Sequence, residues 1–204
     1  GRLLDVGCGS GAYGASLLRL GWQVDGIEPD SAAAERARAA GVQVSAGDLF
    51  SSPLPAAAYD AITLWHVLEH LDDPVAGLRR LRPALKPGGL LLLETPNFAG
   101  LGARLTRSHW FHLDLPRHRV HFTPAGLAQA LTLAGFHVRQ LRHIPNPHGL
   151  AGAIAYRWGE QWRWQPAIQA LGWSFGLLGA ALHHGETLRA AAEPESGRQI
   201  GPPT

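Results

Sequence analysis

A glycine-rich segment that follows an apolar stretch constrains the fold of this chain most. Residues 3–6 (Leu-Leu-Asp-Val) have the composition of a buried parallel strand, and Gly7, Gly9 and Gly11 follow at alternate positions. Glycines at this spacing let the backbone turn sharply and approach a ligand closely, because no Cβ is in the way. A helix is expected from about Ser10 to Leu20, with its free N–H groups directed at the turn. The segment therefore predicts a strand, a ligand-binding turn and a helix.

Two classes of nucleotide ligand fit this turn. The residues from Gly9 to Gly14 match the dinucleotide pattern G-x-G-x-x-G, and those from Gly7 to Ala12 match its relaxed form, which would suit an NAD-dependent oxidoreductase. Asp5 separates the two classes, since a carboxylate two residues before the first glycine repels a pyrophosphate and attracts a cation. Asp5 therefore favours a ligand with a positively charged end.

The segment Asp-Val-Gly-Cys-Gly-Ser-Gly, residues 5–11, resembles the first motif of the class I S-adenosylmethionine-dependent methyltransferases. The cofactor of that family carries an amino group and a sulfonium. The resemblance implies that Asp5 and the backbone of Gly7, Gly9 and Gly11 surround the methionine part of S-adenosylmethionine, and that S-adenosylhomocysteine is the product.

Strands and helices alternate through the first half, as a parallel α/β sheet requires. A second strand is expected at 22–27, followed by Glu28 and a helix that Asp30 or Ser31 caps. An acidic residue at the tip of this strand suits both ribose hydroxyls of a nucleoside. A third strand at 42–46 precedes Asp48 and Leu49, and the resemblance implies that they bond the adenine amino group and cover the ring.

A fourth strand, 59–64, leads directly into Trp65 and His66. Side chains at the carboxyl end of such a strand reach the crevice where open α/β sheets bind ligands, so we expect both residues to face the cofactor or the acceptor. Residues 65–74 are similar to a subgroup of the family that includes quinone-biosynthesis O-methyltransferases. A helix that begins after Asp72 or Asp73, a turn at 86–89 and a strand at 90–94 extend the resemblance over residues 1–96.

His66, Glu69 and His70 form a constellation that could hold a metal, because His66 and His70 would share a helical face. No third histidine follows at a fixed spacing, and the glutamate is not placed as in H-E-x-x-H. We therefore predict no metal site. His66 is instead the candidate general base, needed only if the acceptor is protonated.

Residues 96–122 are too many for a short connection, and we expect them to form the acceptor loop or a lid. The residues from Trp110 to Thr123 also resemble a signature of the same methyltransferase subgroup. Arg117 and His118 suit an anionic or hydroxyl-bearing acceptor, and Trp110 is a further candidate for acceptor binding.

A helix that Thr123 caps and a strand at 136–143 follow, and Glu186 to Ala192 is the candidate last strand. The chain is thus expected to be one α/β domain, residues 1–193, with a Rossmann-like doubly wound sheet of seven strands. The resemblance implies the order 3-2-1-4-5-7-6, with strand 7 antiparallel. A helical insertion, residues 145–185, precedes the last strand, and residues 194–204 are expected to be disordered.

The insertion is mostly apolar and contains Trp158, Trp162, Trp164 and Trp173. Two helices that pack over the acceptor site or against a second copy are the first expectation. Contact with a membrane surface, through these tryptophans with Arg157 and Arg163, is the second. The stretch from Ala167 to Leu182 is shorter than the roughly 20 apolar residues that a transmembrane helix needs.

The composition of the chain limits which binding partners and which cellular compartment are expected. Residues 1–95 hold 8 basic and 11 acidic side chains, a balance of −3, whereas residues 96–204 hold 10 and 5, a balance of +5. The basic residues form no lysine-rich stripe and no nucleic-acid-binding motif appears, so we expect no specific nucleic-acid partner. The single cysteine, Cys8, excludes a disulfide framework. Because no signal peptide is recognised, we expect a cytoplasmic protein that could also contact a membrane surface. The chain begins inside a strand and without methionine, so we expect the natural protein to start earlier.

The sequence thus predicts transfer of a methyl group from S-adenosylmethionine to an oxygen, nitrogen or carbon of a small or lipid-like acceptor. An NAD-dependent oxidoreductase is one alternative, since it uses the same glycine loop. A protein that binds the cofactor without catalysis is the other, because the motifs that are recognised here concern binding.

Overall fold

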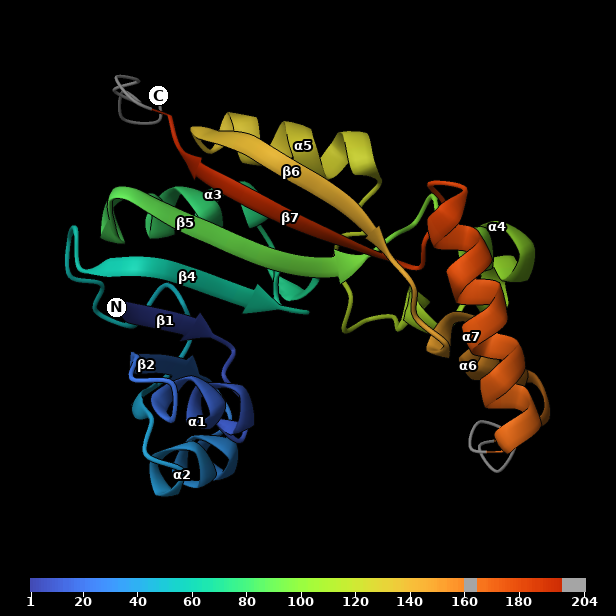
Figure 1. Ribbon diagram of the computed structural model, residues 1–204, viewed down its shortest axis with the longest axis horizontal. Coiled ribbons are helices and arrows are strands. Elements are labelled where there is room, and N and C mark those ends of the chain that lie inside the picture. Colours follow the sequence, from blue (N-terminus) through green and yellow to red (C-terminus); the bar gives the residue numbers. More distant parts are fainter. Residues whose placement is uncertain (160–164, 196–204) are drawn as a thin grey trace.

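The protein is built on one seven-stranded sheet with the order β3-β2-β1-β4-β5-β7-β6 (Figure 1). The computed structural model describes residues 1–159 and 165–195. Strands β1 to β5 pair in parallel, whereas β7 runs antiparallel to both β5 and β6. The predicted fold class and strand order are confirmed. The strands are β1 (Arg2–Val6), β2 (Gln23–Glu28), β3 (Gln43–Ala46), β4 (Tyr59–Trp65), β5 (Leu85–Pro96), β6 (Phe136–Ile144) and β7 (Thr187–Pro194).

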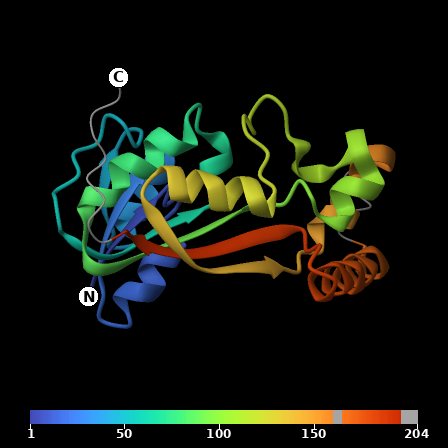
Figure 2. The ribbon, with the colours of Figure 1, turned by 90° about the horizontal axis from the view of Figure 1, so that it is seen from above.

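Helices cover both faces of the sheet. Leu3 and Val24 pack against Ala37 on one face, and Leu4 belongs to the larger core on the other, with Leu78 and Leu127. Figure 2 shows α3 and α5 on one side of the sheet and α1 on the other. This is the doubly wound arrangement that alternating strands and helices predict. The helices are α1 (Ala12–Leu18), α2 (Ser31–Ala39), α3 (Pro74–Leu81) and α5 (Pro124–Leu133).

Side-chain caps fix the starts of three helices. Asp30 accepts a hydrogen bond from the backbone N–H of Ala33 (2.7 Å), and Asp73 accepts one from Ala76 (2.9 Å). Thr123 caps α5 in the same way, through Gly126. Each cap satisfies one of the N–H groups that a helix leaves free in its first turn. The structure thereby resolves the two alternatives that the sequence left open, in favour of Asp30 and Asp73.

The predicted turn at residues 86–89 is part of β5 rather than a separate connection. Tyr59 pairs with Leu85 and Ala61 pairs with Leu90, so the intervening residues bulge out of the ladder. Gly88 takes a φ of 78° in this bulge, a left-handed conformation that favours glycine. The strand therefore begins five residues before the expected Leu90.

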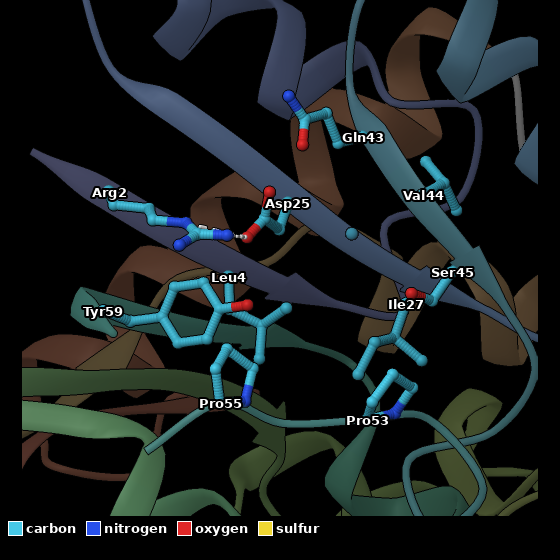
Figure 3. A pocket seen from close by; sticks show the side chains of 11 residues that line it. Arg2, Leu4, Asp25, Ile27, Gln43, Val44, Ser45, Pro53, Pro55 and Tyr59 are labelled. Atoms are coloured by element: carbon cyan, nitrogen blue, oxygen red, sulfur yellow. Dashed lines mark hydrogen bonds and ion pairs between the residues drawn. The ribbon is translucent and has the colours of Figure 1, made fainter. Parts of the chain in front are cut away.

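Residues 47–58 connect β3 to β4 without a helix, and they leave a shallow cavity of about 290 Å³ on one face of β1 to β3. Figure 3 shows this cavity, with Pro53 and Pro55 at one side and Tyr59 near Leu4. Its charged groups already pair, since Arg2 and Asp25 approach to 2.6 Å and the Arg2 guanidinium lies over the Tyr59 ring. The cavity lies below the glycine loop and is not part of the site described next.

Three further helices stand beyond the carboxyl ends of the parallel strands (Figure 1). Helix α4 (Leu101–Thr106) and two 3₁₀ turns, Arg107–His109 and Phe111–Leu113, occupy the region that was expected to be a loop. Helices α6 (His148–Trp158) and α7 (Pro166–Ala181) lie within the expected insertion. Trp162, Arg163, Trp164 and the tail from residue 196 lie outside the described residues. Among the helices of residues 1–159 and 165–195, none has the length and apolarity to cross a membrane.

A buried glutamate joins this helical group to the sheet. Glu186 precedes β7, is fully buried, and accepts a hydrogen bond from the N–H of Gly102 in α4 (2.6 Å). A methyl group at Gly102 or at Gly149 in α6 would overlap its carboxylate. Burial raises the pKa of Glu186, while the Gly102 hydrogen bond and the neighbouring Trp110 indole oppose the rise. The two glycines thus let the first turns of α4 and α6 approach one carboxylate, where helix dipoles favour negative charge.

Candidate cofactor and acceptor site

The glycine loop has the geometry that its sequence predicts. Gly7, Gly9 and Gly11 all take positive φ, at 70°, 55° and 77°. A Cβ at Gly7 would lie 2.5 Å from a methyl carbon of Val67, and one at Gly11 would lie 2.7 Å from the Cα of Ala37. Glycine is therefore required by backbone conformation at all three positions, and also by close packing at Gly7 and Gly11.

Glu28 ties the loop to the end of β2. Its carboxylate is buried and accepts hydrogen bonds from the backbone N–H groups of Gly9 (2.8 Å) and Asp30 (3.0 Å). These bonds fix the side chain in one orientation but leave lone pairs on both oxygens, because a carboxylate can accept about four hydrogen bonds. Glu28 is therefore positioned to accept further donors, such as the two hydroxyls of a ribose.

Asp5 lies buried beneath the loop, where its carboxylate accepts a hydrogen bond from the Thr63 hydroxyl (2.7 Å). Burial raises the pKa of Asp5 to about 6; the Thr63 hydrogen bond opposes the rise and the negative charge of Glu28 adds to it. A cation bound at the loop would stabilise the ionised form. Asp5 is thus a buried acid whose ionised form a positively charged ligand would stabilise.

Most of the predicted cofactor residues meet around a cavity of about 570 Å³, which we call the glycine-loop cavity. It collects side chains from the carboxyl ends of β1, β2 and β4, as expected for an open α/β sheet. Its lining includes Gly7, Glu28, Asp48, Leu49, Trp65, His66, Val67, His70, Leu71 and Arg117. Asp5, Gly9 and Gly11 lie outside this lining.

Asp48 and Leu49 occupy the side of the glycine-loop cavity that follows β3. One Asp48 oxygen accepts hydrogen bonds from the N–H groups of Phe50 (2.8 Å) and Ser51 (2.7 Å), which keep the pKa of Asp48 low together with the Ser51 hydroxyl. Leu49 is buried at the same edge. A charged, exposed acceptor thus stands beside an apolar side chain, an arrangement that suits the amino group and the ring of an adenine.

A second cavity, of about 560 Å³, adjoins the first, and we call it the histidine cavity. The two share His66, His70 and Arg117. The remaining lining comes from the 3₁₀ turn at 111–113, the segment after it, and the start of α6: Phe111, His112, Asp114, His118, Asn146 and His148. Its side chains are mostly aromatic, cationic or able to become cationic.

His66 stands between the two cavities in a constrained conformation. Its φ of 56° is unusual for a residue other than glycine. Its Nδ1 lies 3.1 Å from a Glu69 oxygen, and its Nε2 lies 3.4 Å from an oxygen of Glu94, which also pairs with Arg189. Burial works to lower the pKa of His66, but the hydrogen bonds to the two carboxylates and their charges outweigh it and raise the pKa to about 9. At neutral pH the ring is therefore an imidazolium, which has no lone pair with which to act as a base.

The constellation of His66, Glu69 and His70 does not form as a helical face would place it. Only Leu68–His70 form a single 3₁₀ turn, and His66 precedes it with left-handed backbone. His70 turns away and donates from Nδ1 to the carbonyl of Arg117 (2.9 Å). Ligand atoms of Glu69, His70 and His118 do lie within 4.8 Å of one another, but Glu69 already pairs with His66 and accepts from Thr95.

The segment that contains Arg117 and His118 is held over both cavities by hydrogen bonds. The backbone N–H groups of Arg119 and Val120 donate to the carbonyl of Glu69 (2.8 and 3.2 Å). His118 donates from Nδ1 to the carbonyl of His112 (2.7 Å), and the Arg117 guanidinium lies 3.5 Å from Asp114. Both predicted acceptor-binding residues therefore line the histidine cavity.

Trp110, the third such candidate, does not line either cavity. It is buried behind His112, with ring centroids 5.6 Å apart, and packs against Phe98 and His121. An aromatic residue in a polar segment is as well suited to anchoring that segment as to binding a ligand, which is why sequence alone did not separate the two roles.

Several residues of the site were not singled out from the sequence. Asn146 and His148 line the histidine cavity, and Glu94, together with Glu69, raises the pKa of His66. Glu94 carried a usable signal, since like Glu28 it is an acidic residue near the carboxyl end of a parallel strand. Asn146 and His148 lay inside a stretch that was considered only as an apolar insertion.

Comparison with known proteins identifies the family. A family model described as "Methyltransferase domain" matches residues 1–141. The chain is 34% identical over 182 residues to "Probable S-adenosylmethionine-dependent methyltransferase" of Mycolicibacterium smegmatis, a match that covers 86% of this chain and 68% of the relative. It is 36% identical over 155 residues to ubiquinone biosynthesis O-methyltransferase of Xanthomonas axonopodis pv. citri, covering 69% and 64%. The chain thus spans about two thirds of the length of these relatives.

Solved structures agree on the fold. A crystal structure of an S-adenosylmethionine-dependent methyltransferase from Archaeoglobus fulgidus superimposes with a TM-score of 0.64 at 20% identity, over 94% of this chain and 85% of that one. A second such enzyme, from Mesorhizobium loti, gives a TM-score of 0.64 at 21% identity, over 94% and 89%. The chain belongs to the class I methyltransferases. Within them it is an S-adenosylmethionine-dependent enzyme with O-methyltransferases of quinone biosynthesis among its relatives.

The residues present fit S-adenosylmethionine. The glycine loop is open at Gly9, where a Cβ would meet nothing within 4 Å, and the buried Asp5 carboxylate lacks a cationic partner among its hydrogen bonds in the described chain. Asp5 and Glu28 place two acids near the loop, which suits a cationic cofactor better than a pyrophosphate.

We expect cofactor affinity to weaken as the pH falls below about 6, because Asp5 would then be protonated and would no longer attract a cation. Calorimetric titration with S-adenosylhomocysteine between pH 5 and pH 8 measures this directly. In Asp5→Asn the affinity should be lower throughout and should lose this pH dependence. An Asp5→Asn profile that still falls near pH 6 would assign the titration to another group.

Proposed function

We propose that the protein transfers a methyl group to an oxygen of an anionic acceptor, small or lipid-like, bound in the histidine cavity. The observation that carries the proposal is the junction of the two cavities at His66, His70 and Arg117. A methyl group delivered from the first cavity would meet an acceptor held in the second. The name of the O-methyltransferase relative supports oxygen as the atom that is methylated.

The residues of the junction favour a negatively charged acceptor. His66 is an imidazolium with 40% of its side chain exposed, and Arg117 is more exposed still. Asp114 offsets part of this charge, since it lies near both Arg117 and His118. Glu69 and Glu94 balance the charge of His66, so the 73% exposed Arg117 guanidinium is the most accessible cation at the junction and can orient an acid or a phenolate.

When bound, S-adenosylmethionine supplies a methyl group on a sulfonium, which is already a strong electrophile. The contribution of the protein is then alignment and exclusion of water. Phe111 and Leu71 supply apolar walls, and the Arg117 segment closes over the junction through its bonds to Glu69. In this proposal His66 positions the acceptor as a cation, in place of the base suggested by the sequence.

A matched pair of acceptors tests the proposal. We expect 4-hydroxybenzoate to be methylated with a kcat/KM about fivefold above that of the neutral 4-hydroxybenzamide, since a partly exposed charge pair contributes about 1 kcal/mol. Production of S-adenosylhomocysteine measures both rates. The preference should fall as the pH rises through about 9, where His66 loses its charge.

His66→Gln is the matched variant, because it keeps a polar side chain but cannot titrate. It should lower the preference for the anionic acceptor at every pH and abolish its pH dependence. Because both acceptors present the same kind of phenolic oxygen, a general base at His66 would change the two rates together and leave their ratio constant. That outcome, or a preference for the neutral acceptor, would overturn the role proposed for His66.

We further propose that the protein acts in a reducing compartment such as the cytoplasm. The support is its single cysteine, Cys8, which is buried in the glycine loop and whose pKa burial raises to about 11. A thiol in this state is a packing residue rather than a nucleophile.

A further inference from the structure

Helix α7 presents an uncharged apolar face to its surroundings. Its 16 residues, Pro166–Ala181, include no acidic or basic side chain. Leu171, Trp173, Leu177 and Leu178 are each between 49% and 56% exposed. Exposed apolar side chains are common singly, but a continuous face of them marks a surface that contacts something other than water.

Within the described residues, α7 is held by the side opposite to this face. Gly172 and Gly176 pack so closely on the 146–147 backbone that a Cβ would lie 2.5 Å from the carbonyl oxygen of Pro147 and 2.8 Å from that of Asn146. Gly179 approaches the carbonyl of His184 in the same way. The glycines face inward, so the large side chains of the helix point outward.

The polar side chains of α7 are Gln169 and Ser174. Ser174 is exposed and donates to the carbonyl of Ala170 within the helix (3.0 Å). The large side chains that the helix exposes are all apolar, which favours an apolar environment over an aqueous one.

The segment of the chain that contains α4, α6 and α7 is basic. Residues 97–185 contain eight arginines, no lysine and two acidic residues, a net charge of +6 with histidines neutral; two of the arginines, Arg119 and Arg139, pair with Asp72 and Glu193 outside this segment. Arg104 and Arg107 lie at the end of α4, and the guanidinium of Arg157 lies over the ring of Trp158 at the end of α6. Such charge attracts an anionic surface and repels a second copy of itself.

We propose that α7 binds the surface of an anionic lipid bilayer, with Leu171, Trp173 and Leu178 inserted at the interface. Arginines beside an apolar helix with tryptophan are the features of an interfacial anchor. Self-association through the same face would bring two basic surfaces together at a Coulomb cost, so the lipid surface is the better occupant.

The placement of α7 gives the anchor a functional consequence, which rests on the proposed function. Helix α6, which packs on α7, begins at His148 in the lining of the histidine cavity. Figures 1 and 2 show α4, α6 and α7 together at the end of the molecule toward which the parallel strands point. Anchoring would therefore hold the acceptor cavity beside the bilayer, where a lipid-like acceptor resides.

Vesicle co-sedimentation tests the proposal on the full chain. We expect binding to phosphatidylcholine vesicles that contain phosphatidylglycerol, weaker binding to pure phosphatidylcholine, and loss of the difference at high salt. The double variant Leu171→Asp, Leu178→Asp should partition at least about tenfold more weakly. Leu20→Asp is the matched control, since Leu20 is a 75% exposed leucine that follows α1 and lies outside the group of α4, α6 and α7.

The outcomes separate the proposal from its alternatives. Unchanged vesicle binding in the α7 variant, or no binding by the parent chain, overturns it. A dimer by analytical ultracentrifugation that the same variant dissociates, without vesicle binding, assigns the face to a second copy instead. Methylation of water-soluble 4-hydroxybenzoate and affinity for S-adenosylhomocysteine should not change in the variant, so a failure of the methyl-transfer proposal would be seen separately.

Discussion

Glu28→Ala should abolish cofactor binding while the domain stays folded. The carboxylate accepts from Gly9 and Asp30 and is placed to accept two ribose hydroxyls, so its removal frees the loop and deletes charge-assisted hydrogen bonds to the ligand. Such bonds contribute about 1.5–3 kcal/mol each. We expect the affinity for S-adenosylhomocysteine to fall by about a hundredfold or more, measured by calorimetric titration.

Two companion variants sharpen this measurement. Glu35→Ala removes an exposed carboxylate from α2 and should leave the affinity unchanged. Glu28→Gln keeps the shape and one acceptor oxygen, so its loss should be intermediate. If Glu28→Ala bound the cofactor as tightly as the parent chain, the ribose assignment would have to be abandoned. NAD belongs in the same titration, since binding of NAD alone would favour the oxidoreductase alternative.

Gly149→Ala should destabilise the protein far more than an ordinary glycine-to-alanine change in a helix. The added methyl overlaps the Glu186 carboxylate, which is itself buried and bonded to Gly102. Overpacking of this kind costs about 1–3 kcal/mol, and we expect a loss near the upper end in the free energy of unfolding by urea. Gly126→Ala, where the nearest neighbour of the methyl is 3.3 Å away, should change it by less than about 1 kcal/mol.

A double-mutant cycle identifies the cause. Glu186→Ala removes the overlapping carboxylate, so Gly149→Ala should cost much less in that background than in the parent chain. Additive costs would show that the destabilisation has another origin. The cycle also tests whether Glu186 is the contact that joins α4 and α6 to the sheet.

The geometry around the glycine loop could be predicted because its determinants are local. Asp5, the three glycines and Glu28 lie at strand ends and in a single turn, where spacing and backbone conformation dictate both residue type and position. The strand order followed from the family resemblance, and the caps at Asp30, Asp73 and Thr123 from their side-chain chemistry. Residue type, backbone conformation and position in the sheet agree in these segments, and this agreement makes the segments predictable.

The histidine cavity depends on contacts between segments that are distant in sequence, since it combines residues 66–70, 111–118 and 146–148. The pKa of His66 is raised by Glu69, three residues along the chain, and also by Glu94 on the neighbouring strand. Neither the left-handed backbone at His66 nor the burial of Trp110 has a sequence signature. Charge and burial that are set by tertiary neighbours cannot be read from a local pattern, and the sequence therefore did not predict the raised pKa of His66 or the burial of Trp110.

The position of β7 has a consequence for biosynthesis. The last strand of the sheet lies between β5 and β6, and it pairs with residues 91–96 of β5 and residues 136–144 of β6. Until residues 187–194 leave the ribosome, the facing edges of β5 and β6 therefore have no partner, and unpaired edges promote association with other chains. The nascent protein thus passes through a stage with two open edges, which a single late strand closes at once.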